Sequence, residues 1–361
     1  MARLFLGLDS STQSLSPLVI DLDTRRIVYD GSQSFDDIPE YGTRNGVLPS
    51  DEAGVVHAPP LVWVEALDRV FEQMKERGVP LGQILAISGS GQQHGSVYLK
   101  PGLDDALGRL DPARRLAENL EGVFSRATAP IWQDSSTSAE CREIGEALGG
   151  MLATAAATGS IAIERFTGPQ IRRFFRQDPQ AYEQTGHVAL VSSFLASILA
   201  GRVADIDPGD GAGMNLMDIG RKTWLPEALE ATAPGLAGKL PGVSPSWSVI
   251  GMVSPYFVER YGLAADARCL VWSGDNPNSV VGLGLIQPGM AAISLGTSDT
   301  FIGTMADCHP DPRGEGHVFG SPAGGYMSLI CRTNGSLARE KVKDQYGLDW
   351  DGFSRALADT K

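Results

Sequence analysis

The chain has 361 residues, more than one typical core accommodates, so its length predicts two domains. A net charge of −13 at pH 7 excludes a broad nucleic-acid-binding face. No stretch approaches the roughly 18 uninterrupted apolar residues that a membrane span requires. We therefore expect neither nucleic acid nor membrane as a partner.

The four cysteines and the start of the sequence bear on the compartment. No two cysteines are spaced as in a CxxC redox motif or a zinc knuckle, and free thiols suit a reducing environment. The apolar run before Asp9 is too short for the apolar region of a signal peptide. These features predict a cytoplasmic protein.

The first part of the chain predicts a sheet that begins with hairpins. Apolar runs at residues 3–8 and 15–20, with a third short run after them, are separated by turn residues and predict three antiparallel strands. Residues 62–77 carry apolar groups at helical spacing, and Gly78 ends the predicted helix. Residues 84–90 predict a buried strand that ends in a polar loop containing glycine.

Helices then alternate with strands. Residues 169–184 and 188–201 predict two helices, the second largely buried. Residues 268–274 predict a strand, with a helix behind it at 276–286. Residues 290–305 again predict strand, hydroxyl-rich turn and strand. The whole pattern indicates an α/β fold.

An internal repeat links the two ends of the chain. The segments "LFLGLDSSTQSLSPLVI" and "AAISLGTSDTFIGTM" share one plan of apolar strand, Ser/Thr/Gly turn and returning strand. Two such hairpins facing each other across a cleft would supply two turns able to hold phosphate. The alternative is coincidence, because β-hairpins are common.

"WSGDNPNSVVG" places Asp275 at the end of a strand and just ahead of Pro277, which favours the first turn of a helix. Ligands of open α/β sheets bind at such positions. The helix dipole favours the ionised carboxylate, so Asp275 is expected to be charged at neutral pH and able to accept a proton. A plain N-cap Asp is the alternative reading.

Two further loops offer polar groups suited to sugar hydroxyls. "SGSGQQHGSVY" places Gln93 and His94 after a strand, and "ERFTGPQIRR" places Arg165 before a turn into a helix. A buried, hydrogen-bonded structural histidine and a solvated surface arginine are the corresponding alternatives.

The first hairpin turn follows Asp9. Its backbone N–H groups and hydroxyls can form an anion-binding concavity, and Asp9 could order magnesium, usually through water. The chain has no GxxxxGK[ST] loop and no GxSxG elbow, which excludes a Walker-type nucleotide site and makes an α/β-hydrolase improbable.

Eight segments in order together resemble the FGGY family of carbohydrate kinases, most closely the eukaryotic type of xylulose kinase. They are "LGLDSSTQS", "GSGQQHGSVY", "WQDSS", "ERFTGPQIRRFF", "DPGDGAGMNL", "SGDNPNSVVGLGL", "ISLGTSDT" and "NGSLAREK". The resemblance implies an actin-like ATPase fold, with two ribonuclease-H-like domains around a cleft. It places a sugar-binding domain at residues 1–285 and the start of a nucleotide-binding domain at 286–361. It also favours duplication over coincidence for the repeat.

The resemblance implies ATP-dependent phosphorylation of the terminal hydroxyl of D-xylulose, with Mg²⁺ as cofactor and Asp275 as general base. It implies sugar contacts by Gln93, His94, Arg165 and Asn276 beside Asp275. It assigns the nucleotide and its metal to the two turns and one aromatic residue: Asp9, also the metal-organising acid, Ser11, Thr12, Gln13, Ser294, Gly296, Thr297, Ser298 and Trp350. A homodimer is compatible with it.

Two departures from the family pattern stand out. The family usually has a Lys in the strand returning from the first turn, where this chain has Ser16 followed by Pro17. Because Pro cannot donate to a sheet ladder, that strand is expected to be an edge strand or to carry a bulge. The chain also stops at Lys361, where the second domain has barely begun, which predicts a truncated chain. These departures keep open a sugar-binding or regulatory protein without a competent ATP site, and a kinase of another ketopentose or polyol.

Overall fold

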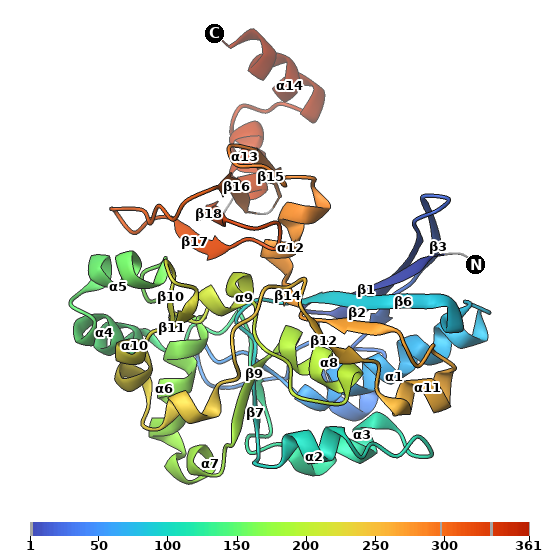
Figure 1. Ribbon diagram of the computed structural model, residues 1–361. Coiled ribbons are helices and arrows are strands. Elements are labelled where there is room, and N and C mark those ends of the chain that lie inside the picture. Colours follow the sequence, from blue (N-terminus) through green and yellow to red (C-terminus); the bar gives the residue numbers. More distant parts are fainter. Residues whose placement is uncertain (1–2, 297, 333–334, 361) are drawn as a thin grey trace.

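The computed structural model describes residues 3–296, 298–332 and 335–360. An eight-stranded sheet forms the body of the N-terminal part (Figure 1). Its strand order is β12 (Val249–Met252), β13 (Arg268–Leu270), β6 (Ile84–Gly91), β1 (Leu4–Ser10), β2 (Ser14–Asp21) and β3 (Arg26–Asp30), with β14 (Ser273–Gly274) beside β6 and β4 (Gln33–Ser34) beside β2. β1, β2 and β3 are antiparallel, as predicted, while β6 lies parallel to β1, β13 and β14. This is the order of a ribonuclease-H-like sheet.

The strand with the proline lies inside the sheet. β2 pairs with β1 on one side and with β3 and β4 on the other, so the edge-strand alternative is wrong. The bulge alternative holds, because the register between β2 and β3 shifts between Val19 and Ile20. Pro17 falls between the residues that pair with β4 and those that pair with β3, so its missing N–H interrupts neither ladder.

Three helices cover one face of this sheet: α1 (Pro60–Glu76), α8 (Val191–Ala200) and α11 (Pro255–Tyr261) (Figure 1). The predicted helix at 62–77 is α1, which begins two residues earlier because Pro60 is well suited to the first helical position. Gly78, at φ 72°, follows its end. The apolar side of α1 is buried against β1 and β2, where Leu6 and Trp63 are among the largest fully buried side chains.

A second group of helices lies beside the sheet (Figure 1): α4 (Ser138–Ala147), α5 (Met151–Thr158), α6 (Thr167–Gln177), α7 (Pro179–Glu183), α9 (Pro208–Ala212) and α10 (Pro226–Thr232). The predicted helix at 169–184 is divided into α6 and α7, because Pro179 begins a new helix. The predicted helix at 188–201 begins only at Val191, since residues 187–190 pair with another strand. The short elements are β5 (His57–Ala58), β7 (Ser96–Leu99), β8 (Ala129–Pro130), β9 (His187–Leu190), β10 (Met217–Asp218), β11 (Thr223–Trp224), α2 (Leu103–Leu107) and α3 (Leu116–Leu120).

The C-terminal part has its own antiparallel sheet, in the order β15 (Ala291–Leu295), β16 (Asp299–Met305), β18 (Tyr326–Arg332) and β17 (His317–Gly320). The predicted strand–turn–strand at 290–305 is the β15–β16 hairpin, which repeats the plan of β1–β2. α12 (Asp275–Gly282), shorter than the predicted helix at 276–286, leads into this part, and α13 (Gly335–Gln345) and α14 (Trp350–Asp359) end it. The domain boundary after residue 285 stays a prediction; it falls between the strands of the two sheets.

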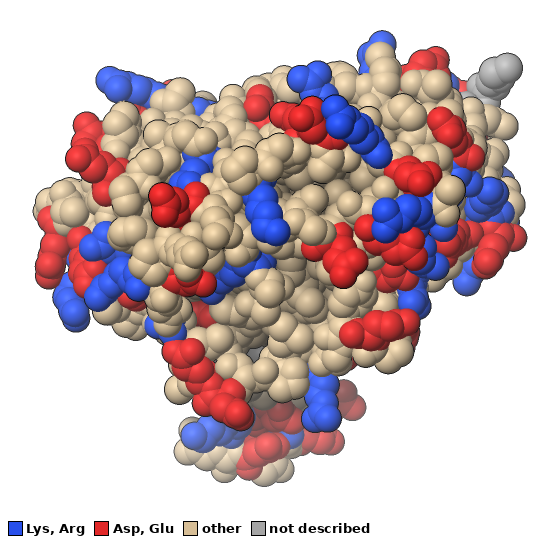
Figure 2. All heavy atoms as spheres, turned by 90° about the horizontal axis from the view of Figure 1, so that it is seen from below, with Lys and Arg blue, Asp and Glu red and all other residues tan. Residues whose placement is uncertain are grey.

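The surface carries both signs of charge. Figure 2 shows Lys and Arg side chains interspersed with Asp and Glu over the face that it presents. Within the described residues, no helix combines the length and the apolar character needed to cross a bilayer.

Candidate active site

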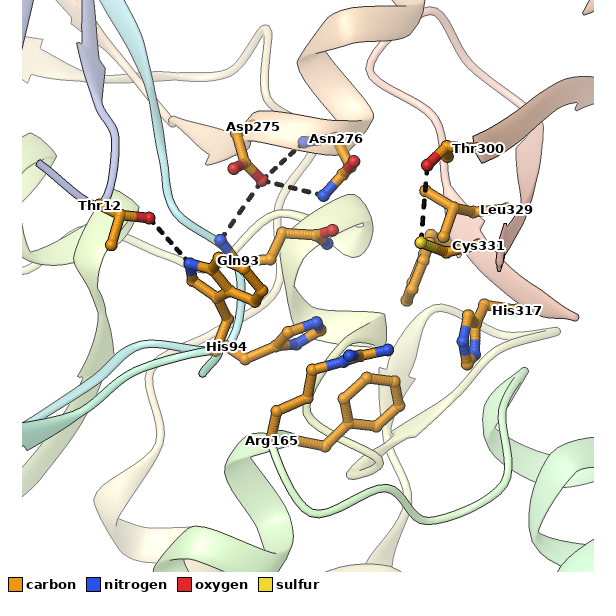
Figure 3. Close-up of a pocket in the computed structure, with 13 residues that line it drawn as sticks. Thr12, Gln93, His94, Arg165, Asp275, Asn276, Thr300, His317, Leu329 and Cys331 are labelled. Atoms are coloured by element: carbon orange, nitrogen blue, oxygen red, sulfur yellow. Dashed lines mark hydrogen bonds between the residues drawn. The ribbon is translucent and has the colours of Figure 1, made fainter. Parts of the chain in front are cut away.

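The candidate site lies where β6 and β14 end side by side. β14 is parallel to β6 and in register with its last residues, so the segments that follow the two strands emerge at one edge. The loop after β6 carries Gln93 and His94, and α12 begins at Asp275 directly after β14. A cavity of about 230 Å³ opens there (Figure 3). Its lining comes from both parts of the chain: Thr12, Gln93, His94, Trp132, Arg165, Phe166, Asp275, Asn276, Thr300, His317, Phe319, Leu329 and Cys331.

Asp275 is the partly buried acid of this cavity. Its Oδ1 accepts hydrogen bonds from the backbone N–H of Asn276 (2.7 Å), the side-chain amide of Asn276 (3.2 Å) and the backbone N–H of Gln93 (3.4 Å) (Figure 3). Burial raises the pKa of Asp275 to about 6, opposed by the Asn276 N–H and assisted by the charge of Asp9. The carboxylate is therefore still mainly ionised at neutral pH. The N-cap of α12 is Gly274, so the plain N-cap interpretation of Asp275 is wrong.

His94 is a neutral imidazole in the cavity wall. Its Nδ1 lies 2.9 Å from the carbonyl oxygen of Gly213. A carbonyl only accepts, so Nδ1 carries the proton and Nε2 keeps a free lone pair. Burial, with Arg165 as the second cause, lowers the pKa of His94 to about 3. The ring packs on Phe166 with 4.5 Å between centroids. Nε2 can thus accept a hydrogen bond from a hydroxyl group.

Arg165 and Gln93 complete the polar side of the cavity. The guanidinium of Arg165 extends between the rings of His94 and His317 (Figure 3). The side chain is partly buried and lines the cavity, so the interpretation as a solvated surface charge is wrong. The side-chain amide nitrogen of Gln93 is buried and has no hydrogen-bond partner among the described residues. Both side chains can therefore donate to a bound ligand.

The first hairpin turn reaches the same cavity through Thr12. Thr12 Oγ1 accepts a hydrogen bond of 2.8 Å from the indole nitrogen of Trp132, and both residues line the cavity. Ser11 closes the turn on itself, since its backbone N–H donates to the carbonyl of Ser14, and Gln13 is exposed. Of the turn residues that were predicted to bind nucleotide, Thr12 alone lines this cavity.

Asp9 is the last but one residue of β1 and accepts a hydrogen bond of 2.5 Å from Ser90 through Oδ1. The described residues contain no group of three or more His, Cys, Asp or Glu side chains able to hold a metal ion together. A magnesium ion at Asp9 would accordingly take most of its ligands from water and phosphate oxygens, which is the usual way this ion binds in phosphoryl-transfer sites. The single carboxylate fits that kind of metal binding.

The second hairpin turn lies outside the cavity lining. The carbonyl of Gly296 accepts a hydrogen bond from the backbone of Ser336 (2.8 Å), and Arg339 pairs with Asp299 at 2.6 Å, so α13 fastens this turn. Ser294 is exposed, neither Gly296 nor Ser298 lines the cavity, and Thr297 lies outside the described residues. Their nucleotide-binding roles stay predictions.

Trp350 is also remote from the cavity. It begins α14, far from the loops that line the site (Figure 1), and is 53% exposed. Its ring packs on Phe353 with 6.0 Å between centroids. The structure does not bring it together with the sugar-side residues, and its contact with a nucleotide stays a prediction.

Sequence reasoning missed His317, Trp132 and Phe166 as lining residues. Trp132 and Phe166 belong to the segments "WQDSS" and "ERFTG". The resemblance of these segments to the family could therefore have indicated both residues. His317 sits in "GEGHVFG", which carries no local motif. Only the docking of β17 against the N-terminal part brings it into the cavity wall.

The sheet order, the repeated hairpin and a partly buried acid at a strand end define a protein of the actin-like ATPase fold class. Residues 127–282 match the sequence model described as "FGGY family of carbohydrate kinases, N-terminal domain". The chain is 45% identical to "Xylulose kinase" of Rattus norvegicus and 44% identical to "Xylulose kinase 2" of Arabidopsis thaliana. Each match covers 99% of this chain and, respectively, 67% and 64% of the relative, so the chain spans about two thirds of their length.

Two solved structures that are titled as kinases share this fold. A "xyloylose kinase from Brucella ovis" superposes with a TM-score of 0.81 at 23% identity, covering 99% of this chain and 66% of that one. The xylulose kinase from Rhodospirillum rubrum gives a TM-score of 0.80 at 18% identity, with 98% and 66% covered. The chain belongs to the FGGY family of carbohydrate kinases.

Proposed function

We propose that this chain carries the sugar site and catalytic base of an ATP-dependent kinase that phosphorylates the terminal hydroxyl of D-xylulose to give D-xylulose 5-phosphate in pentose metabolism. One observation carries the proposal: the partly buried carboxylate of Asp275, whose pKa is raised to about 6, shares one cavity with His94, Arg165 and Asn276. The similarity to xylulose kinases over 99% of the chain supports D-xylulose as the sugar.

Asp275 acts as the general base. The N–H groups of Asn276 and Gln93 hold its Oδ1, which leaves Oδ2 for the hydroxyl of the sugar. A base whose pKa lies slightly below the working pH is mostly ionised and still binds a proton well. General base catalysis of this kind usually accelerates a reaction by about 10²–10⁴-fold. The proton of the acceptor hydroxyl passes to the carboxylate as the sugar oxygen attacks the terminal phosphorus of ATP. The bond from that phosphorus to the bridging oxygen breaks, and ADP leaves.

The neutral polar groups position the sugar. Nε2 of His94 accepts from one hydroxyl, while Arg165, Asn276 and Gln93 donate to others. Because the Gln93 amide nitrogen has no partner among the described residues, a sugar lacking the matching oxygen would leave it unpaired. Sites built in this way discriminate strongly against such analogues.

The nucleotide is assigned to the two hairpin turns. Asp9, Ser11, Thr12 and Gln13 of the first turn and Gly296, Thr297 and Ser298 of the second are the proposed phosphate-holding residues, with Trp350 against the nucleotide. Bound Mg²⁺, organised by Asp9, would neutralise developing charge on the transferred phosphoryl group. The effect of Asp9 on the pKa of Asp275 supports this placement, since it requires the two acids to be close.

A sugar-binding or regulatory protein on the same scaffold is the second candidate, favoured by Ser16 alone. ATP-dependent phosphorylation of D-xylulose, measured for the wild type, Asp275→Ala and the exposed control Asp266→Ala, separates the two. We expect turnover by the wild type and the control, and a loss of about 10²–10⁴-fold in Asp275→Ala. Sugar binding without turnover in the wild type would favour the regulatory candidate. Full activity of Asp275→Ala would remove the assignment of the base.

A further inference from the structure

His317 belongs to the C-terminal sheet but docks on the N-terminal part. The backbone N–H of Val318 donates to the carbonyl of Gly159 at 2.8 Å, and Nδ1 of His317 lies 3.1 Å from Ser160 Oγ. A Cβ added at Gly159, whose φ is 87°, would stand 2.3 Å from the carbonyl oxygen of Val318. The strand therefore approaches residues 159–160 as closely as a glycine allows, and this contact fixes the position of the imidazole.

The imidazole of His317 faces the cavity in one defined orientation. It stacks on Phe319 with 5.9 Å between centroids and an interplanar angle of 26°, and it packs on Phe166 at 5.7 Å. Ser160 engages Nδ1, which leaves Nε2 for a ligand. The side chain is only 7% exposed, and burial with the nearby Arg165 lowers its pKa to about 4, so it is neutral at physiological pH.

The arrangement gives the cavity two polar ends. Figure 3 shows Asp275 and Asn276 at one end and His317 at the other, with Arg165 between the rings of His94 and His317. The hydroxyl that loses its proton must lie at Asp275. An extended sugar held there can point its opposite end towards His317, between the apolar side chains of Phe166 and Leu329 that also line the cavity.

We propose that His317 is a sugar-positioning residue that hydrogen-bonds, through Nε2, the oxygen at the end of the ketose opposite to the phosphorylated hydroxyl. The inference rests on the proposed function and deepens it. For a pentulose accepted at C5, that oxygen is the C1 hydroxyl. The sugar then bridges the N-terminal part and the C-terminal sheet, and His317 makes selection depend on the remote end of the substrate as well as on the reacting end.

The test compares three proteins, each titrated with two sugars. D-xylulose and 1-deoxy-D-xylulose, which lacks the C1 hydroxyl, are titrated calorimetrically into the wild type, His317→Asn and His309→Asn. His309 is an exposed histidine of the same C-terminal part and serves as the matched control. We expect the wild type and the control to bind D-xylulose about tenfold or more tightly than the deoxy sugar, the range for one buried hydrogen bond. His317→Asn should lose most of that preference.

The outcomes distinguish a failure of the proposed substrate from a failure of the proposed role of His317. A wild-type chain that binds neither sugar overturns the proposed substrate together with the role of His317. A wild type that prefers D-xylulose, with the same preference in His317→Asn, overturns the role of His317 alone. If His317 had a purely structural role, its replacement would weaken the binding of both sugars equally and leave the preference for D-xylulose unchanged. If thermal unfolding shows that His317→Asn is misfolded, Ser160→Ala is titrated instead. It removes only the partner of Nδ1 and so frees the imidazole from its fixed orientation. It should reduce the preference for D-xylulose, and an unchanged preference would overturn the role of His317.

Discussion

Asp9 and Ser16 lie directly opposite each other in the antiparallel register of β1 and β2. Residues in this relation project from the same face of a sheet, within reach of each other's side chains. The resemblance to the FGGY family predicts a Lys near this position, whereas Ser16 Oγ here donates to Ser32 Oγ at 3.3 Å. The departure from the family pattern is therefore located beside the acid that we assign to magnesium and phosphate.

Replacing Ser16 by lysine should strengthen nucleotide binding. The ammonium group would stand next to Asp9 and could bond a phosphate oxygen, and a charge-assisted hydrogen bond of this kind corresponds to roughly tenfold in affinity. Titration of Mg·ATP into the wild type and Ser16→Lys measures the change. Ser50→Lys adds the same charge at an exposed position whose hydroxyl bonds to the carbonyl of Glu52, away from Ser16 in the hydrogen-bond network, and is the control. Equal affinity in all three proteins would mean that the departure has no effect on nucleotide binding.

The position of His94 depends on the absence of a side chain at Gly213. A Cβ added there would stand 2.8 Å from both Cε1 and Nδ1 of the imidazole, too close for the ring to stay in place. We expect Gly213→Ala to weaken D-xylulose binding by about tenfold or more, because the ring must move and its hydrogen bonds to the sugar are lost.

Gly238→Ala is the matched control for this change, since nothing lies within 4 Å of a Cβ at that position. Thermal unfolding of both variants shows whether the fold persists, and titration with D-xylulose reports on the site. Wild-type affinity in a folded Gly213→Ala protein would contradict the assignment of His94 to the sugar.

The predicted site residues that the structure brings together are those that a short sequence pattern could locate. A buried strand followed by a polar loop locates His94, and a strand followed by Asp and Pro locates Asp275, so both fall at one sheet edge. The docking of β17 could not be predicted in this way. The contact between Val318 and Gly159 joins segments about 160 residues apart, and neither segment carries a signal for the other.

The same limit explains the error about β2. Proline avoids interior strands because it has no N–H to donate to a neighbouring strand. The sequence does not show that the strand pairing beside β2 is interrupted opposite this proline. Residues 31–32 separate β3 from β4, and Pro17 lies opposite that gap. Tertiary pairing thus accommodates a residue that the sequence alone assigns to an edge.

Asp275 should lower the stability of the fold in return for its role as a base. Its folded-state pKa of about 6 exceeds the ordinary value of 3.8, so the folded protein binds this proton more tightly than the unfolded chain does. Well below pH 3.8 the carboxyl group is protonated in both the folded and the unfolded chain, and it does not lower the free energy of unfolding. The cost grows as pH rises and is complete above about pH 6, where a shift of this size corresponds to about 3 kcal/mol.

Asp275→Asn removes the charge while its amide oxygen can still accept the N–H of Asn276. We therefore expect the variant to unfold at a higher urea concentration than the wild type at pH 8, with the difference vanishing near pH 3.5. Asp266→Asn, at an exposed position, is the control for the loss of a carboxylate. A variant less stable than the wild type at pH 8 would show that the hydrogen bonds to the carboxylate outweigh its desolvation, and the same carboxylate would then be a weaker base than its raised pKa implies.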